Sequence, residues 1–218
     1  MNTENGKKLK IDKTTCWYDN DKAPKQMIRG ARGELWPTLE NSAHFPILEQ
    51  LINAMLKQCS SCISLVEVGC GAAEFQRVFT NFFYTGADLP NVIDNVAKIV
   101  NPIGRYIKFD LYKNEMKFLN DFDSVLMNAF IDVLEYPIFG FEKVLNNSNS
   151  YVLLHRQTLT REKTHTIIND SYGGKTYKSL INFQEFMNVL TEKGFTIVEE
   201  IRFPFEPNTF SFLLRKVK

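Results

Sequence analysis

The sequence predicts an α/β protein with a doubly wound, mostly parallel sheet that has helices on both of its faces. The apolar run at residues 63–68 is followed by two glycines and a helical pattern, as in a buried strand, a tight turn and a helix. Further strand-then-helix units follow along the chain. The last two strand-like segments, residues 195–203 and 209–217, are separated only by PFEPN and are expected to pair as an antiparallel hairpin.

The composition fits one domain. The chain has 218 residues, of which 44% are hydrophobic, and this is enough for one full core. Its net charge of +1 argues against a nucleic-acid partner, because binding to the phosphate backbone usually requires a basic excess. The N-terminus is polar, and no apolar run approaches the roughly 18 residues of a membrane span. We therefore expect a cytoplasmic protein that binds neither nucleic acid nor membrane.

The first 40 residues are expected to form an arm outside the main domain, which covers residues 41–218. Residues 1–14 lack apolar spacing and are expected to be mobile. Residues 16–39 have two interpretations: a lead-in that its aromatic residues hold against the domain, or a lid that brings cations to an anionic substrate. The aromatic and cationic residues concerned are Trp17, Tyr18, Lys22, Lys25, Arg29, Arg32 and Trp36.

Asn41 or Ser42 is expected to cap the first packing helix, which has Pro46 in its first turn. Its apolar face is formed by Leu48, Leu51, Ile52, Met55 and Leu56. The C-x-x-C pair Cys59 and Cys62 follows the helix. A structural zinc site needs four ligands, and the histidines are not spaced to complete one. We therefore predict no metal, and we interpret both cysteines as small, buried or half-buried residues.

Glu67 lies near the end of the apolar strand, just before Gly69 and Gly71. A buried carboxylate is costly unless a cation or polar group meets it, so we expect Glu67 to face a ligand ammonium group. The glycines allow a sharp turn and a close approach of the backbone to that ligand, beside a helix predicted over residues 75–83. The third glycine of the dinucleotide fingerprint G-x-G-x-x-G is missing, which disfavours an NAD-type oxidoreductase.

The stretch from Glu67 to Ala73 resembles the first motif of class I, Rossmann-like S-adenosylmethionine-dependent methyltransferases, E/D-x-G-x-G-x-G, with Ala73 in the third glycine slot. The resemblance implies a single seven-stranded sheet whose antiparallel seventh strand lies beside the fifth. It also implies S-adenosylmethionine as the cofactor. Gly69, Cys70 and Gly71 would approach the cofactor through their backbone, and Glu67 would bind its amino end.

The second predicted strand, residues 84–88, ends at Asp88. This residue comes nineteen positions after Gly69, near the place where Rossmann-type units put the carboxylate that binds ribose hydroxyls. It fits the second motif of the resembled family, and we include the neighbouring Leu89 in the cofactor site.

The third strand, residues 106–109, follows a helical stripe over residues 92–100 and ends at Asp110. In the resembled family, the positions of Asp110 and Leu111 lie beside the adenine of the cofactor. A turn or capping role for Asp110 is an equal alternative.

The fourth strand, residues 121–128, ends at Asn128, which we add to the candidate cofactor site. The next residues resemble the fourth-motif region of small-molecule methyltransferases: V-L-E at positions 133–135 matches, and Tyr136 replaces a histidine. The N-P-P-Y motif of nucleic-acid amino-methyltransferases and the double-E loop of protein arginine methyltransferases have no match. The resemblance therefore implies a small-molecule acceptor.

The fifth strand, residues 151–154, delivers His155 and Arg156 to the same edge of the sheet. The unperturbed pKa of a histidine, near 6.5, suits proton removal, so His155 is the first candidate for a catalytic base; a packed structural role is the alternative. Tyr172 is the second candidate. It lies at the tip of a long connection that is either a flap over the substrate or an ordinary hairpin turn.

A capping box of Asn182 and Glu185 predicts a helix that Gly194 ends, before the C-terminal hairpin. The resemblance covers this part of the chain as well.

The resemblance implies methyl transfer from S-adenosylmethionine to an oxygen or nitrogen atom of a small metabolite. The cations near the N-terminal aromatic residues favour an acceptor that contains a sugar or a phosphate group. One alternative is a non-catalytic cofactor-binding or scaffold protein with the same fold, and a less favoured one is an NAD-type oxidoreductase. The sequence leaves the oligomeric state open.

Overall fold

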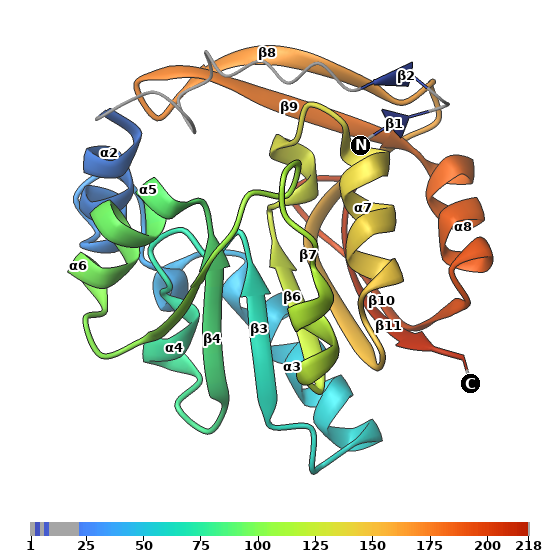
Figure 1. Cartoon of the computed structure of the whole chain (residues 1–218), viewed down its shortest axis with the longest axis horizontal. Helices are drawn as coiled ribbons and strands as arrows, with labels where there is room; N and C mark the ends of the chain where they lie inside the picture. Colours follow the sequence, from blue (N-terminus) through green and yellow to red (C-terminus); the bar gives the residue numbers. More distant parts are fainter. Residues whose placement is uncertain (1–2, 5–6, 9–21, 218) are drawn as a thin grey trace.

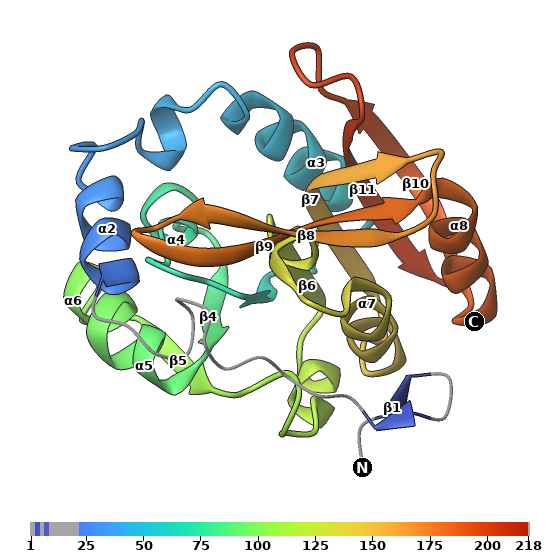
Figure 2. The same cartoon turned by 90° about the horizontal axis from the view of Figure 1, so that it is seen from above.

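The computed structural model describes Thr3–Glu4, Lys7–Lys8 and residues 22–217 (Figures 1 and 2). The two short N-terminal strands, β1 (Thr3–Glu4) and β2 (Lys7–Lys8), pair antiparallel. Residues 1–2, 5–6 and 9–21 of the predicted arm, with Trp17 and Tyr18, lie outside the described residues.

The other described strands form one sheet of nine strands. Its main path runs in the order β10-β11-β7-β6-β3-β4-β5, and β9 pairs with β7 and carries β8. The prediction of seven strands describes the main path, but it is wrong for the whole sheet because it omits β8 and β9. The strands are β3 (Ser64–Val68), β4 (Phe83–Asp88), β5 (Arg105–Lys108), β6 (Ser124–Asn128), β7 (Tyr151–Thr160), β8 (His165–Ser171), β9 (Gly174–Asn182), β10 (Phe195–Arg202) and β11 (Thr209–Lys216).

Five neighbouring strands of the main path, β5, β4, β3, β6 and β7, are parallel. Strand β11 lies between β7 and β10 and is antiparallel to both, which confirms the predicted antiparallel C-terminal strand. The carboxyl ends of the five parallel strands therefore meet at one edge of the sheet. In open α/β sheets this edge is where ligands bind.

Helices cover both faces of the sheet, as predicted. Successive side chains of a strand point to opposite faces, so Val66 packs in one core with helices α7 (Pro137–Asn146) and α8 (Phe183–Glu192). Leu65 packs in the other core with helix α3 (Phe45–Gln58). Figure 1 shows these helices around the central strands.

The helix after the glycine turn is shorter than predicted. Helix α4 (Phe75–Val78) ends well before residue 83. The ring of Phe79 stacks on Phe75 with a centroid distance of 4.5 Å, and the ring of Phe82 lies 5.9 Å from it. The spacing of these aromatic residues therefore reflects a shared cluster and not a continuous helical face.

Helix α3 begins at Phe45 and not near Asn41 or Ser42, so the predicted cap is wrong. The side chain of Asn41 donates to Thr38 Oγ1 over 2.8 Å, and Ser42 Oγ donates to the carbonyl of Leu39 over 2.6 Å. Both side chains thus close the preceding turn, η1 (Leu39–Asn41), instead of capping the helix.

The helix predicted over residues 92–100 contains one π turn that the periodicity did not predict. It consists of α5 (Pro90–Val92), the π turn η2 (Ile93–Ala97) and α6 (Lys98–Val100). Among the described residues, no helix is long and apolar enough to cross a bilayer.

The long connection after β7 is a two-stranded hairpin, β8–β9, whose tip is Tyr172 and Gly173. Positive φ angles of 51° and 76° at these two residues match the tight turn of a two-residue hairpin. Figure 2 shows the hairpin crossing above the sheet toward helix α2 (Lys22–Ala31). A Cβ atom on Gly173 would lie 2.7 Å from Gln26 Nε2, so the tip packs directly on this helix.

The predicted cap of α8 is confirmed, because Asn182 Oδ1 accepts a hydrogen bond of 3.1 Å from the backbone N–H of Glu185. In a capping box the second residue also bonds back to the backbone N–H of the first, and here the Thr164 hydroxyl links these two groups. This hydroxyl accepts from the backbone N–H of Asn182 and donates to the Glu185 carboxylate. Gly194, with a φ of 69°, follows the helix.

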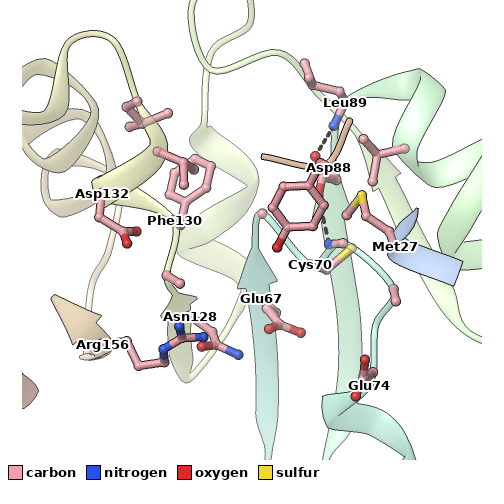
Figure 3. Close-up of a pocket in the computed structure, with 18 of the residues that line it drawn as sticks. Met27, Glu67, Cys70, Glu74, Asp88, Leu89, Asn128, Phe130, Asp132 and Arg156 are labelled. Carbon is pink, nitrogen blue, oxygen red and sulfur yellow. Dashed lines mark hydrogen bonds between the residues drawn. The ribbon is translucent and has the colours of Figure 1, made fainter. Parts of the chain in front are cut away.

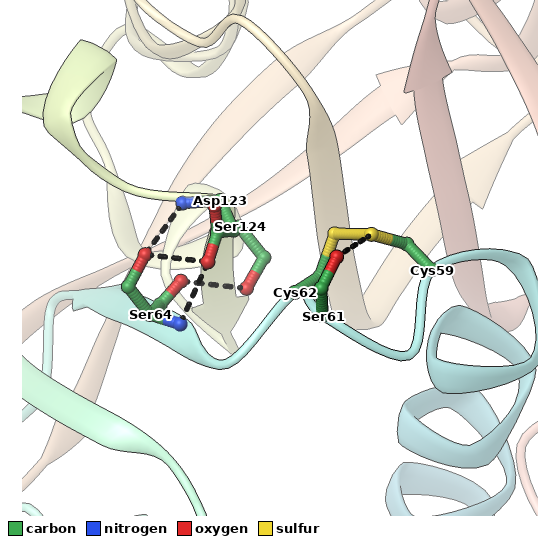
Figure 4. Close-up of a disulfide and its surroundings, with 6 residues drawn as sticks. All are labelled: Cys59, Ser61, Cys62, Ser64, Asp123 and Ser124. Atoms are coloured by element: carbon green, nitrogen blue, oxygen red, sulfur yellow. Dashed lines mark hydrogen bonds between the residues drawn. A yellow bond between two sulfur atoms is a disulfide. The ribbon is translucent and has the colours of Figure 1, made fainter.

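Strand β3 begins just after a disulfide, and its first residue is hydrogen-bonded to Asp123, the residue before β6 (Figure 4). Asp123 Oδ2 accepts hydrogen bonds from both the backbone N–H and the hydroxyl of Ser64, over 2.9 and 2.8 Å. Cys59 and Cys62 are bonded to each other, which the sequence did not predict, although Cys62 is buried and Cys59 half-buried, as expected.

Candidate functional site

A cavity of about 400 Å³ opens at the carboxyl ends of β3, β4, β6 and β7 (Figure 3). Nine of the predicted site residues line it: Glu67, Gly69, Cys70, Gly71, Asp88, Leu89, Leu111, Asn128 and Tyr172. Two of them, Asp110 and His155, do not. The sheet therefore brings most of the predicted site together, as expected for residues at the ends of neighbouring parallel strands.

The glycine turn after β3 forms part of the cavity wall. Gly69 and Gly71 have φ angles of 75° and 52°, in the left-handed region that favours glycine. A Cβ atom at Gly69 would lie 2.3 Å from the ring of Phe130, and one at Gly71 would lie 2.9 Å from the terminal methyl of Met27. Both positions therefore favour glycine for backbone conformation, and Gly69 favours it for space as well, whereas the flexible end of Met27 could move away from a side chain at Gly71.

Asp88 holds this turn in place. Its Oδ2 atom accepts a hydrogen bond of 2.8 Å from the backbone N–H of Gly71, and its Oδ1 atom accepts one of 2.7 Å from the N–H of Leu89. Burial raises the pKa of Asp88 to about 6, although these two donors act in the opposite direction. The carboxyl group therefore both orients the glycine turn and faces the cavity.

Glu67 lines the same cavity and is almost completely buried, with 4% of its surface exposed. Its Oε2 atom accepts a hydrogen bond of 2.5 Å from the hydroxyl of Tyr84. Burial raises the pKa of Glu67 to about 8, and the nearby Asp88 and Glu74 raise it further, whereas the Tyr84 bond lowers it. The cavity extends from Glu67 to Asp88, so Glu67 does not end in packed core.

The carboxylate of Asp110 is engaged in its own turn. Its Oδ1 atom accepts from the backbone N–H of Tyr112 over 3.0 Å, and its Oδ2 atom pairs with Lys113 Nζ at 2.6 Å. This is the turn role that the sequence left open as an alternative. Leu111, the next residue, does line the cavity.

His155 is fully buried behind the cavity wall. Its Nε2 atom lies 3.0 Å from Nδ1 of His44, and its Nδ1 atom lies 2.8 Å from the hydroxyl of Ser211. Burial lowers the pKa of His155 well below 6.5, and the positive charge of Arg156, together with that of His44 whenever its ring is protonated, acts in the same direction. The placement does not favour direct contact between His155 and a substrate.

His44, which no sequence pattern indicated as a site residue, lines the cavity in front of His155. Burial, followed by the charge of Arg156, lowers the pKa of His44 to about 4, so the ring is neutral at pH 7. Local sequence gave no signal for this residue, because its partner His155 is 111 positions away.

Arg156 reaches the cavity because of a bulge in β7. His155 and Arg156 together face the single residue Ser211 of β11, where the pairing register shifts by one. Arg156 takes a φ of 63° at this bulge. Bulges redirect side chains from their regular alternation, so Arg156 lines the cavity while His155 stays in the core.

The roof of the cavity comes from two distant segments. Trp36 and Tyr172 make an edge-to-face contact with a centroid distance of 5.6 Å. The tip of the β8–β9 hairpin is therefore both an ordinary tight turn and part of the cavity wall. The contact of Trp36 fits both interpretations of residues 16–39, a lead-in held against the domain and a lid. Arg29 does not supply the cation expected of a lid, because it pairs with Glu34 on the surface.

No protein-family model and no curated protein matches the sequence. Solved structures do match. An amino pentose methyltransferase from Micromonospora echinaspora, involved in calicheamicin biosynthesis, is 12% identical; the match covers 86% of this chain and 95% of that one, with a TM-score of 0.61. The chain has the Rossmann-like methyltransferase fold.

Two other matches have the same fold. An S-adenosylmethionine-dependent methyltransferase from Mesorhizobium loti is 18% identical, with 82% and 100% of the two chains covered and a TM-score of 0.59. The magnesium protoporphyrin IX methyltransferase from Synechocystis is 11% identical, with 88% and 87% covered and a TM-score of 0.55. At such identities the likeness shows the fold alone, so the chemistry of the cavity has to be argued from its own residues.

The raised pKa of Glu67 predicts how stability depends on pH. A carboxyl group whose folded pKa lies above its unfolded value favours the folded state at low pH and loses this contribution as the pH rises through the folded pKa, here about 8. We expect Glu67→Gln to raise the melting temperature at pH 8.5 by roughly 4 °C or more and to change it little at pH 5. Scanning calorimetry of the ligand-free protein measures both values. The exposed control Glu162→Gln should show no such difference, and an equal effect at both pH values would contradict the prediction.

The left-handed backbone at Arg156 predicts a difference between two truncations. Both Arg156→Gly and Arg156→Ala remove the guanidinium group, but only glycine adopts this φ without a Cβ clash. Urea denaturation should show the glycine variant to be more stable than the alanine variant by about 1 kcal/mol. Equal stability, or a more stable alanine variant, would mean that the bulge is not strained.

Proposed function

We propose that the protein transfers a methyl group from S-adenosylmethionine to an oxygen or nitrogen atom of a small metabolite. One observation carries the proposal: Glu67, the glycine turn and Asp88 line one continuous cavity at the carboxyl ends of β3 and β4. Each is a group that the resembled motif assigns to the cofactor. The fold shared with the amino pentose and porphyrin methyltransferases supports the same conclusion.

In this proposal each residue binds or borders a different part of the cofactor. Glu67 binds the amino group, Asp88 binds the ribose hydroxyls, and Leu89 and Leu111 contact the adenine. Gly69, Cys70 and Gly71 let the backbone approach closely, and Asn128 borders the reacting end. Asp110 acts on this site only by holding the turn that presents Leu111. S-adenosylmethionine, when bound, supplies a methyl group activated on a sulfonium.

The ionisation of Glu67 is linked to the binding of the cationic amino group of this ligand. A carboxyl group with a pKa of about 8 is mostly protonated at pH 7 in the empty site. An ammonium group beside it favours the ionised form, so binding releases a proton. The buried carboxyl group therefore gives the site a preference for a cationic ligand over a neutral one.

Proton removal from the acceptor, where it is needed, has two candidate groups in the wall. The neutral ring of His44 lines the cavity and is held by His155 and Ser211 behind it. Tyr172 reaches the cavity from the roof. His155 itself remains a predicted base, but its burial makes a supporting role through His44 the better fit.

We propose further that the acceptor contains a sugar or a phosphate group. The aromatic rings of Trp36 and Tyr172 and the guanidinium of Arg156 line the cavity, and such groups suit a polar ring with a nearby anion. A panel of amino sugars and sugar phosphates, assayed for methylated product, tests this class. Equal turnover of neutral and anionic analogues would remove the motivation for it.

Cofactor binding is tested by titration calorimetry with S-adenosylmethionine. The wild-type protein should bind it, and Asp88→Asn should weaken binding by roughly tenfold or more, about 1.4 kcal/mol, because an amide offers only one acceptor to the N–H groups of Gly71 and Leu89 and a weaker partner to ribose. Asp94→Asn, on an exposed residue that pairs with Lys98, is the matched control and should bind normally.

The same experiment separates the alternatives. A titration with NADH should give no binding, and saturable NADH binding would favour an oxidoreductase. Binding of S-adenosylmethionine with no methylated product from any acceptor would favour a cofactor-binding scaffold. Absence of S-adenosylmethionine binding would overturn the proposal.

A further inference from the structure

One end of the cavity contains two buried oxygen atoms without a hydrogen-bond partner among the described residues, Oδ1 of Asn128 and Oδ1 of Asp132. Both residues line the cavity. Burying a polar atom without a hydrogen-bond partner costs roughly 1–3 kcal/mol of stability. Such atoms therefore indicate a ligand that forms hydrogen bonds with them. An ionised carboxylate only accepts hydrogen bonds, so the ligand group that meets Asp132 must be a donor.

Arg156 brings a positive charge to the same end. Among the described residues its guanidinium makes no ion pair within 4.0 Å, including with Asp132, and no hydrogen bond. The β7 bulge and its left-handed backbone direct this side chain into the cavity. A guanidinium in such a position is suited to bind a carboxylate or phosphate with two parallel hydrogen bonds.

Asp132 and Arg156 lie apart from the residues assigned to the ribose and adenine of the cofactor, whereas Asn128 borders its reacting end. Strand β7, which carries Arg156, is three strands away from β4, which carries Asp88. Three strand spacings are about 14 Å. Figure 3 shows Asp132, Asn128 and Arg156 on one side, Asp88 and Leu89 on the other, and Glu67 between them.

We propose that Asp132 and Arg156 bind the methyl acceptor, and that this acceptor carries an amine or hydroxyl donor together with an anionic group, a carboxylate or a phosphate. Asp132 accepts the hydrogen bond from the donor, and Arg156 binds the anion. The inference rests on the proposed methyl transfer, because it names the acceptor of the same site.

The electrostatics of Asp132 agree with this assignment. Burial raises the pKa of its carboxyl group to about 6, and Glu206 acts in the same direction, whereas Arg156 and Lys178 lower the pKa. An ammonium or hydroxyl donor would offset the lost hydration of the carboxylate. Arg156 influences Asp132 at a distance but does not pair with it, so both groups remain available to one ligand that carries a donor and an anion.

The test uses the full chain saturated with S-adenosylhomocysteine and measures small probes by NMR titration. Glycine and phosphoethanolamine carry an amine together with a carboxylate or a phosphate. Ethanolamine carries the amine alone, and acetate and inorganic phosphate carry the anion alone. We expect at least one of the two-group probes to bind roughly tenfold more tightly than the single-group probes. The better one of glycine and phosphoethanolamine identifies the anion.

Variants assign each group to its residue. Arg156→Met should weaken the two-group probe by roughly tenfold and leave ethanolamine unchanged, and Arg156→Lys should restore part of the affinity. Asp132→Asn should weaken ethanolamine and the two-group probe but leave the single anions unchanged. The matched controls are Arg161→Met and Asp121→Asn, which remove the same charges from exposed positions outside the cavity and should change nothing.

S-adenosylhomocysteine affinity and melting temperature are measured for every variant and should stay near the wild-type values. If S-adenosylhomocysteine binds but no probe prefers Arg156 and Asp132, this inference is wrong and the proposed function stands. If the wild-type protein does not bind S-adenosylhomocysteine, the proposed function fails and the inference fails with it.

Discussion

The burial of Glu67 and Asp88 at the ends of two neighbouring parallel strands is the constraint on which the cavity depends. Removing two carboxyl groups from water is costly, and the raised pKa values of both groups express this cost. The Tyr84 hydroxyl and the N–H groups of Gly71 and Leu89 offset it only in part. The bond from the Gly71 N–H group also ties the glycine turn to Asp88, so one carboxyl group contributes both to the electrostatics and to the shape of the cavity wall. A cationic ligand would offset the rest of the cost.

The parts of this site that the sequence predicted are those whose signals are local. Gly69 and Gly71 follow a buried strand directly, and Glu67 and Asp88 are each visible as an acidic residue at the end of an apolar run. The residues that the sequence missed depend on pairing between distant segments. His44 has no role until β7 brings His155 within 3.0 Å, and nothing near His44 in the sequence indicates this contact.

A local sequence pattern does not decide between two structures when it is compatible with both. An acidic residue after a strand suits a ligand site or a turn. Both Asp88 and Asp110 accept hydrogen bonds from backbone N–H groups of their turns, but of the two only Asp88 also lines the cavity. The aromatic spacing after Phe75 suits a helix or a cluster, and the cluster formed because the rings stack on one another. The one-residue bulge that redirects Arg156 arises from the register between β7 and β11, which neither strand encodes alone.

Backbone strain is concentrated around the cavity. Ala129, Arg156 and Tyr172 all adopt positive φ, and all three line the cavity. A left-handed conformation costs about 1–2 kcal/mol at a residue with a Cβ atom, and glycine would avoid it. At Arg156 the strain accompanies a guanidinium that has no ion pair among the described residues, and at Tyr172 it accompanies a ring that contacts Trp36 in the roof. The fourth described non-glycine residue with positive φ, Ala73, is buried in the core beside the glycine turn, so three of the four strained residues lie at the cavity, as is common at functional sites.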